Sequence, residues 1–401
     1  MKRLIPFALL LLSPTPVLAG ATDTELWITL GSDAVKPVTE AFVREGWAAP
    51  TPYLTKDDVT LLPVFESQLE RIAQVMHDQF NRCAGFVTYD SYQEAMASLT
   101  PSAQADVWPP TVPSYELNNA ATVNRLIAAL AESNIRSTIE TMSAYTTRYY
   151  TSTTGVASAK WLRDHWASLA AGRPDITTEL FNHASWAQPS VILTIPGSTL
   201  PNQVVVVGGH LDSISSGSTA PGADDNASGI ATFTEVIRAA VAVGYKPVRT
   251  VKFIGYAAEE VGLRGSKEIA AYFKNNGIDV VGVLQLDMTN YTTTTAKAKV
   301  GVITDYTNTN QNAFLRNLIS TYVGVTQADS TCGYACSDHA SWSNAGFAAS
   351  IPHEAIVSQG NPYIHTVNDT ITRSGGTANH ALHFAKIAAA YVAELGEDSA
   401  P

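Results

Sequence analysis

The sequence has no excess of basic residues, no long apolar run beyond its first twenty positions, and only three cysteines. Its 25 basic and 36 acidic residues give a formal net charge of −11, which argues against nucleic acid or an anionic membrane as a partner. No stretch reaches the roughly 20 apolar residues that a membrane-spanning helix needs, so we expect no membrane span. The 401 residues, 45% of them hydrophobic, suffice for one large core or two smaller ones.

The first nineteen residues have the three parts of a secretory signal peptide. Lys2 and Arg3 form a basic start, an apolar run follows from Leu4 to Leu12, and Val17 and Ala19 stand at −3 and −1 before Gly20. We therefore expect residues 1–19 to direct bacterial export, and the mature protein to be a soluble, secreted monomer.

Cysteine usage allows one small disulfide loop. In an oxidising compartment, Cys332 and Cys336 in the segment CGYAC are close enough in the chain to bridge. Cys83 is then left over, either as a buried thiol or as part of a segment that is later discarded.

A proline-rich stretch divides the chain. Residues 102–121 contain Pro109, Pro110 and Pro113, which disfavour helix and indicate a linker. Residues 20–106 precede the boundary with a strand-like piece at 25–31 and a helical piece at 65–80, so they predict a small α+β unit without clustered catalytic residues. We expect this unit to be a propeptide that inhibits the enzyme or helps it fold, with a permanent domain as the alternative. Residues 107–401 would form the catalytic domain.

The second part of the chain has an α/β pattern. Continuous Val/Ile-rich strands alternate with amphipathic helices, which indicates a mixed, mostly parallel central sheet sandwiched by helices. The expected strands are 191–195, 204–207, 250–256, 279–286 and 299–304, and the expected helices include 228–244, 266–277 and 311–323. In such sheets functional residues gather at the carboxyl ends of the strands.

Histidine and acidic residues follow several of these strands. Mixed imidazole and carboxylate ligands suit zinc. The candidates are His210, Asp212, Asp225, Glu259, Glu260, Asp287, Asp338, His339, His353 and His365.

Each candidate also has an ordinary structural interpretation. A single histidine after a strand is more often structural, Asp225 precedes a helix and could cap it, and Glu259-Glu260 could be a solvated pair. His353-Glu354 resembles the start of a zinc-binding HExxH helix, but Val357 stands at the fifth position. The histidines outside this set of candidates are interpreted as structural: His77, His165, His183, His380 and His383.

Six segments together resemble peptidase family M28, and within it the secreted leucyl aminopeptidases of Vibrio and Aeromonas. They are, in order, GGHLDS, PGADDNASG, AAEEVGLRGS, LQLDM, CGYACSDHASW and NPYIHTVNDT, and the resemblance spans about residues 115–395. It implies a zinc-exopeptidase fold of the phosphorylase/hydrolase-like kind and removal of the N-terminal residue from peptides.

The resemblance also implies a ligand set for two zinc ions per catalytic domain. His210 and Asp287 resemble the terminal ligands of one ion, and Glu260 and His365 those of the other. Asp225 matches the bridging carboxylate, and the family has a cis peptide bond after it.

Further roles follow from the same resemblance. Glu259 matches the general base that activates a zinc-bridging water, Asp212 matches the acid that orients His210, and Cys332 and Cys336 match the family disulfide. The residues expected around the substrate are Met288, Tyr334, Ile351, Val357 and Ile364.

The pocket departs from the family pattern, because His353, Val357 and Gly360 stand among positions where those relatives have large apolar residues. A hydrophobic preference is expected, but a preference for leucine is not inherited. The alternatives on the same scaffold are a carboxypeptidase, a single-metal glutaminyl cyclase, or a non-catalytic binding protein that has lost ligands.

Overall fold

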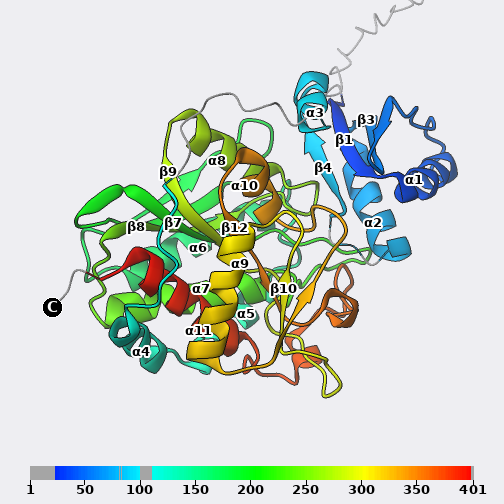
Figure 1. Cartoon of the computed structure of the whole chain (residues 1–401). Helices are drawn as coiled ribbons and strands as arrows, with labels where there is room; N and C mark the ends of the chain where they lie inside the picture. The colour runs from blue at the N-terminus through cyan, green and yellow to red at the C-terminus, as the bar shows by residue number, and fades with distance from the viewer. Residues whose placement is uncertain (1–22, 81, 83, 100–110, 399–401) are drawn as a thin grey trace, which may run out of the picture.

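The computed structural model describes residues 23–80, 82, 84–99 and 111–398, which form two domains with separate sheets (Figure 1). We call residues 23–99 the N-terminal domain and residues 111–398 the C-terminal domain. The expected signal peptide, the boundary at residue 106 and Cys83 lie outside the described residues. Within the described part of the chain, no helix combines the length and apolar character needed to cross a lipid bilayer.

The C-terminal domain is built around a six-stranded sheet in the order β12-β9-β7-β8-β6-β5. Its strands are β5 (Thr177–Phe181), β6 (Ser190–Ile195), β7 (Leu200–His210), β8 (Arg249–Tyr256), β9 (Asp279–Gln285) and β12 (Ala349–Ser350). The four strands from β12 to β8 run parallel, and β6 and β5 are antiparallel to their neighbours. The prediction of a mixed, mostly parallel sheet is confirmed.

Strand β7 shows why its sequence is a continuous run of valines. Successive side chains of a strand point to opposite faces of the sheet. Val205 and Val207 belong to the hydrophobic cluster on one face, and Val204 and Val206 to the cluster on the other. All four are buried, because helices cover both faces.

The helices divide unequally between the two clusters. Residues of α4 (Ala120–Ala129), α5 (Glu132–Ser143), α6 (Thr153–Leu169), α7 (Ala227–Ala242), α9 (Thr309–Leu318) and α11 (Ala381–Gly396) join the larger cluster. Residues of α8 (Arg264–Asn275) and α10 (His339–Ala345) join the smaller cluster on the opposite face. The sheet is therefore a buried middle layer.

The strand expected at 299–304 forms, but it belongs to a second, three-stranded sheet. That sheet consists of β11 (Gln327–Ser330), β10 (Val300–Ile303) and β13 (Pro352–His353). Short helical turns at Ile319–Val323, Val357–Gln359 and Ile371–Ser374 complete the domain.

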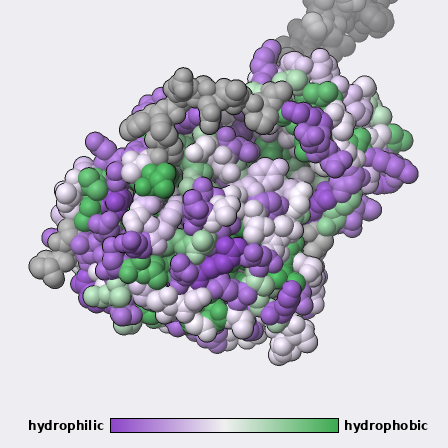
Figure 2. All heavy atoms as spheres, viewed as in Figure 1, coloured by the Kyte–Doolittle hydropathy of each residue, from purple (hydrophilic) through white to green (hydrophobic). Residues whose placement is uncertain are grey.

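The N-terminal domain is a small α+β unit whose buried side chains form clusters together with residues of the C-terminal domain. Its antiparallel sheet has the order β2-β3-β1-β4, formed by β1 (Glu25–Gly31), β2 (Leu54–Lys56), β3 (Val59–Phe65) and β4 (Phe86–Tyr89). The helices are α1 (Ser32–Arg44), α2 (Leu69–Phe80) and α3 (Tyr92–Leu99), with a single turn at Glu66–Gln68 before α2. On the face seen in Figure 2, hydrophilic and hydrophobic residues are interspersed over both domains.

Candidate metal centre and active site

Three neighbouring strands deliver the candidate residues to one edge of the central sheet. Strand β7 ends at His210, Glu259 and Glu260 follow β8, and Asp287 follows β9. Because β9, β7 and β8 are adjacent and parallel, their carboxyl ends meet. All four side chains are buried.

The first group that could hold a metal consists of His210, Asp225 and Asp287. One ligand atom from each lies within 4.8 Å of the others. His210 Nε2 is 3.0 Å from Asp225 Oδ1 and 3.4 Å from Asp287 Oδ1.

The second group consists of Asp225, Glu260 and His365, with ligand atoms again within 4.8 Å of one another. His365 Nε2 is 2.7 Å from Glu260 Oε2 and 3.3 Å from Asp225 Oδ2. Asp225 therefore turns one oxygen toward each group.

The backbone around these residues is unusual. The peptide bond between Asp225 and Asn226 is cis, as the family resemblance implied. Three non-glycine residues at or next to candidate functional residues have positive φ values. They are Ala258 (56°), Met288 (57°) and His365 (52°). Left-handed conformations at non-glycine residues are costly and cluster at functional sites.

The glycines of this region allow close approach of the backbone. A Cβ on Gly209 would lie 2.6 Å from the carbonyl oxygen of Leu286, and a Cβ on Gly229 would lie 2.2 Å from the same oxygen. Asn226 reinforces the contact, because its side chain caps α7 at Gly229 and donates to that carbonyl at 2.9 Å. These contacts bring Asp225 and Asp287 together.

Asp212 organises the loop after β8. Its Oδ1 accepts a hydrogen bond from the backbone N–H of Glu259 and its Oδ2 one from Glu260, both at 3.1 Å. Oδ1 also lies 3.5 Å from His210 Nδ1. Asp212 thus fixes both glutamates and contacts the far side of the histidine.

The pKa values of the acidic residues and histidines in the site depend on one another's charges. Burial alone would raise the pKa of Asp225, but bonds from His210 and His365 hold it well below its usual range. Burial would lower the pKa of His365, but the charges of Glu260 and Asp225 raise it to about 10. Burial raises the pKa of Glu260 to about 7. The cluster therefore attracts positive charge.

Glu259 lies beside this cluster but in neither of the groups found among the described residues. Burial raises its pKa well above the ordinary value, with His210 opposing the shift and Glu260 adding to it. Asp338 is a second buried neighbour, and burial raises its pKa to about 7. Gln285 Nε2 donates to Asp338 Oδ2 at 2.8 Å, so Asp338 is held by protein contacts.

A cavity opens next to Asp287. All five residues expected around the substrate line it: Met288, Tyr334, Ile351, Val357 and Ile364. The wall is mostly apolar, with His353 and Gly360 as the departures noted from the sequence. His353 lines this cavity and belongs to neither metal group. His339 is buried, and its Nε2 lies 3.3 Å from the backbone carbonyl oxygen of Asp305.

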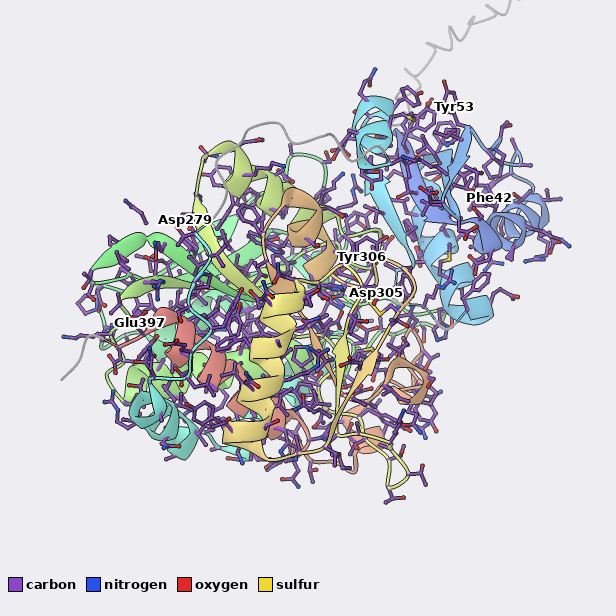
Figure 3. All side chains as sticks on the ribbon, viewed as in Figure 1. Phe42, Tyr53, Asp279, Asp305, Tyr306 and Glu397 are labelled. Carbon is purple, nitrogen blue, oxygen red and sulfur yellow. A yellow bond between two sulfur atoms is a disulfide. The ribbon has the colours of Figure 1, made fainter. Side chains whose placement is uncertain are left out.

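The disulfide between Cys332 and Cys336 is present and forms part of the same wall. Asp305 supports this loop by accepting hydrogen bonds from the backbone N–H of Cys332 at 3.1 Å and of Gly333 at 2.7 Å. Figure 3 shows Asp305 and Tyr306 on the side of the C-terminal domain that faces the N-terminal domain. The disulfide loop thus holds Tyr334 at the border between the domains.

The N-terminal domain packs on the loop that carries the two glutamates. Thr88 donates two hydrogen bonds here: its N–H to the Gly262 carbonyl at 3.1 Å and its hydroxyl to the Val261 carbonyl at 2.8 Å. Glu66 pairs with the buried Arg264 at 2.7 Å. Gly262 has a φ of 97°, and a Cβ there would lie 2.3 Å from the Thr88 hydroxyl.

The end of α2 reaches the metal groups and the cavity. The His77 ring lies with its centroid 5.1 Å from that of His365, and the Arg82 guanidinium lies 5.2 Å from the centre of the Tyr334 ring. The sequence placed His77 among the structural histidines, because nothing in a helical pattern links it to a residue so distant in the chain.

The sequence did not identify two residues that support the metal groups through hydrogen bonds. Asp369 accepts hydrogen bonds from the backbone N–H of Asp225 at 3.0 Å, and the Ser337 hydroxyl donates to Asp287 Oδ2 at 2.6 Å. Both lie inside segments that carried the family resemblance. A single polar residue in a loop has no periodicity that would reveal such a role.

Comparison with known proteins agrees with this geometry. A sequence model described as peptidase family M28 matches residues 190–392. The chain is 36% identical over 330 residues to a probable leucine aminopeptidase of Trichophyton verrucosum, covering 80% of this chain and 88% of that protein. It is 39% identical over 291 residues to leucine aminopeptidase 1 of Emericella nidulans, covering 68% and 73%.

A solved structure is also similar. The crystal structure of the LapA aminopeptidase of Legionella pneumophila superposes with a TM-score of 0.79 and 28% identity, covering 94% of this chain and 100% of that one. A match of that extent includes the N-terminal domain. The similarity to known proteins therefore reaches further toward the N-terminus than the resemblance deduced from the sequence.

Proposed function

The chain belongs to peptidase family M28 and is a metallo-aminopeptidase, and from this premise we propose that it is a secreted enzyme that uses two zinc ions. The observation that carries the proposal is the position of Asp225. One of its oxygens faces His210 and the other faces His365, as a carboxylate shared by two metals requires.

The residues fit zinc in both type and arrangement. His210 and Asp287 would hold one ion, Glu260 and His365 the other, and Asp225 both, which gives mixed nitrogen and oxygen ligands. When bound, zinc supplies Lewis acidity that polarises a peptide carbonyl and lowers the pKa of water. Asp212 would orient His210, since carboxylates that contact the far nitrogen of a ligand histidine set its direction.

Glu259 would act as the general base. It takes a proton from the attacking water and then delivers it to the amine that leaves as the peptide bond breaks. Its position supports the role, because it is buried beside the metal groups without belonging to either. Shielding from bulk water lets the carboxyl retain the proton until the amine takes it.

The cavity beside Asp287 would receive the side chain of the substrate's N-terminal residue. Met288, Ile351, Val357 and Ile364 favour a hydrophobic side chain there. The buried carboxylates of the site would attract the free α-amino group, which restricts cleavage to the first residue of a peptide.

Export rests on the signal-peptide pattern of residues 1–19. The Cys332–Cys336 disulfide supports an oxidising destination outside the cytoplasm. The N-terminal domain would be an inhibitory propeptide, because α2 lies against His365 and Arg82 lies over Tyr334 at the cavity.

The reaction is tested with a panel of aminoacyl 4-nitroanilides and matched N-acetylated compounds, with zinc counted on the purified protein. We expect hydrophobic anilides to be cleaved, acetylated ones to be refused, and two zinc ions per chain. Release of C-terminal residues, cyclisation of N-terminal glutamine, or a single zinc ion would contradict the proposal.

The role of the N-terminal domain is tested by cutting the chain within residues 100–115 and comparing hydrolysis before and after. A marked rise in rate supports inhibition. If the full chain already hydrolyses anilides as fast as the cut one, the domain is a folding aid or a permanent part of the enzyme.

A further inference from the structure

The end of α2 places the His77 ring of the N-terminal domain against His365, a residue of the second metal group. We propose that His77 is a metal ligand supplied by this domain, and that its Nε2 binds the metal held by Asp225, Glu260 and His365 in the full-length chain. This inference rests on the proposed metal centre and gives the inhibitory domain a specific chemical contact.

The His77 ring lies next to a residue of the second metal group. The His77 and His365 ring centroids are 5.1 Å apart, with the planes tilted by 41°. The charges of His365 and Asp225 both act on His77, so the ring lies within electrostatic reach of two residues of the second metal group. His77 and His365 also border the same small pocket between α2 and residues 214–216.

The tautomer of His77 suits a ligand. Its Nδ1 lies 3.2 Å from Asp78 Oδ1, and a carboxylate oxygen accepts hydrogen bonds, so Nδ1 carries the proton. Nε2 then keeps its lone pair. Ligand histidines in proteins commonly donate their other ring N–H to a carboxylate in this way.

The environment of His77 Nε2 also favours metal binding. Nε2 is buried, and within the residues that the structure describes no protein atom forms a hydrogen bond with it. Buried polar atoms nearly always have a partner. His77 Nε2 lies outside the three-residue group, but its ring contacts His365, and a bound metal would supply the partner that Nε2 lacks among the described residues.

The helix that carries His77 is firmly held. Four residues of α2 are buried in a hydrophobic cluster that joins the two domains: Leu69, Ile72, Ala73 and Met76. Beyond its last turn, Arg82 forms an ion pair with Asp33 at 2.7 Å. The ring is therefore presented by a fixed element.

A second explanation is that His77 merely stacks on His365 and blocks access. Replacement by phenylalanine distinguishes metal binding from stacking, because H77F keeps an aromatic ring and removes the ring nitrogens. H77A removes the ring and its nitrogens together. The matched control is Gln74→Ala, one turn earlier on α2 and facing the same cavity.

The experiment uses the full-length, uncut chain loaded with Co²⁺, whose visible absorption reports the number and kind of ligands. We expect H77F and H77A to alter the cobalt spectrum and to lose metal to a chelator at least tenfold more readily than wild type, by analogy with the roughly 10–100-fold effect of perturbing ligand support. Q74A should behave as wild type. Anilide hydrolysis by uncut H77F should rise toward the rate of the cut wild-type enzyme.

Two results would overturn the inference. The first is a wild-type cobalt spectrum and chelator resistance in uncut H77F. The second is uncut H77F that hydrolyses anilides as slowly as the uncut wild type while uncut H77A hydrolyses them faster. That result would show that His77 inhibits by ring stacking alone. Cut H77F serves as the folding control and should match the cut wild type. If the cut wild type neither binds cobalt nor hydrolyses anilides, the proposed function itself fails.

Discussion

The two ends of the central sheet differ in how their buried acidic groups are arranged. At the amino end, protein donors satisfy them. Glu394 Oε2 accepts hydrogen bonds from the backbone N–H groups of Asn118 and Asn119, each at 2.9 Å. Asp279 accepts two from Thr111, both at 2.7 Å. Figure 3 shows Asp279 and Glu397 on the side of the molecule away from the N-terminal domain.

At the carboxyl end, acidic groups face one another and two histidines. Glu259 and Glu260 are adjacent and fully buried, and burial raises the pKa of both. Such an arrangement is unfavourable for the chain by itself and becomes favourable with a bound cation. The difference teaches that buried acids gathered around histidines indicate function, whereas single buried acids held by backbone donors are structural.

The strongest test of this contrast is Asp225→Ala. We expect loss of both metals and loss of measurable hydrolysis, because this residue faces both groups. His365→Ala should chiefly weaken one metal. Metal counting and anilide hydrolysis on the purified variants check both statements. Two tightly held zinc ions in D225A would remove the bridging role.

Glu259→Gln separates chemistry from metal binding at the same end of the sheet. The amide keeps the size of the side chain but cannot accept the proton, so kcat should fall by about 10²–10⁴-fold with zinc retained. Measured turnover close to wild type would exclude Glu259 as the base. Loss of zinc would instead make it a ligand.

The metal edge could be predicted because it depends on local patterns. Valine runs identify strands buried on both faces, and parallel strands bring His210, Glu260 and Asp287 to one edge. The membership of β10 in a separate sheet could not be predicted, since strand pairing depends on packing of distant segments. The same limit explains His77, whose contact with His365 arises from the docking of two domains.

A smaller effect is expected at the cavity wall. Replacing Cys332 and Cys336 with serine should lower the free energy of unfolding by no more than the low end of about 2–4 kcal/mol, because the closed loop is short. The larger effect should be on KM, through the placement of Tyr334. Mass spectrometry of the wild type should find the pair oxidised. An unchanged KM in the double variant would show that Asp305 alone positions the loop.

The smallest effect on activity is expected at the amino end of the sheet, from Glu394→Ala. This change removes the acceptor for the N–H groups of Asn118 and Asn119 and for the Tyr322 hydroxyl. Leaving such donors without a partner costs about 1–3 kcal/mol of stability. Because Glu394 lies at the end of the sheet opposite the metal groups, kcat/KM and zinc content should stay at wild-type values. Denaturant unfolding and anilide kinetics on the same preparation measure both quantities. A stability loss without a kinetic change would separate structural from functional buried acids, whereas loss of zinc in E394A would show that the two ends of the sheet are coupled.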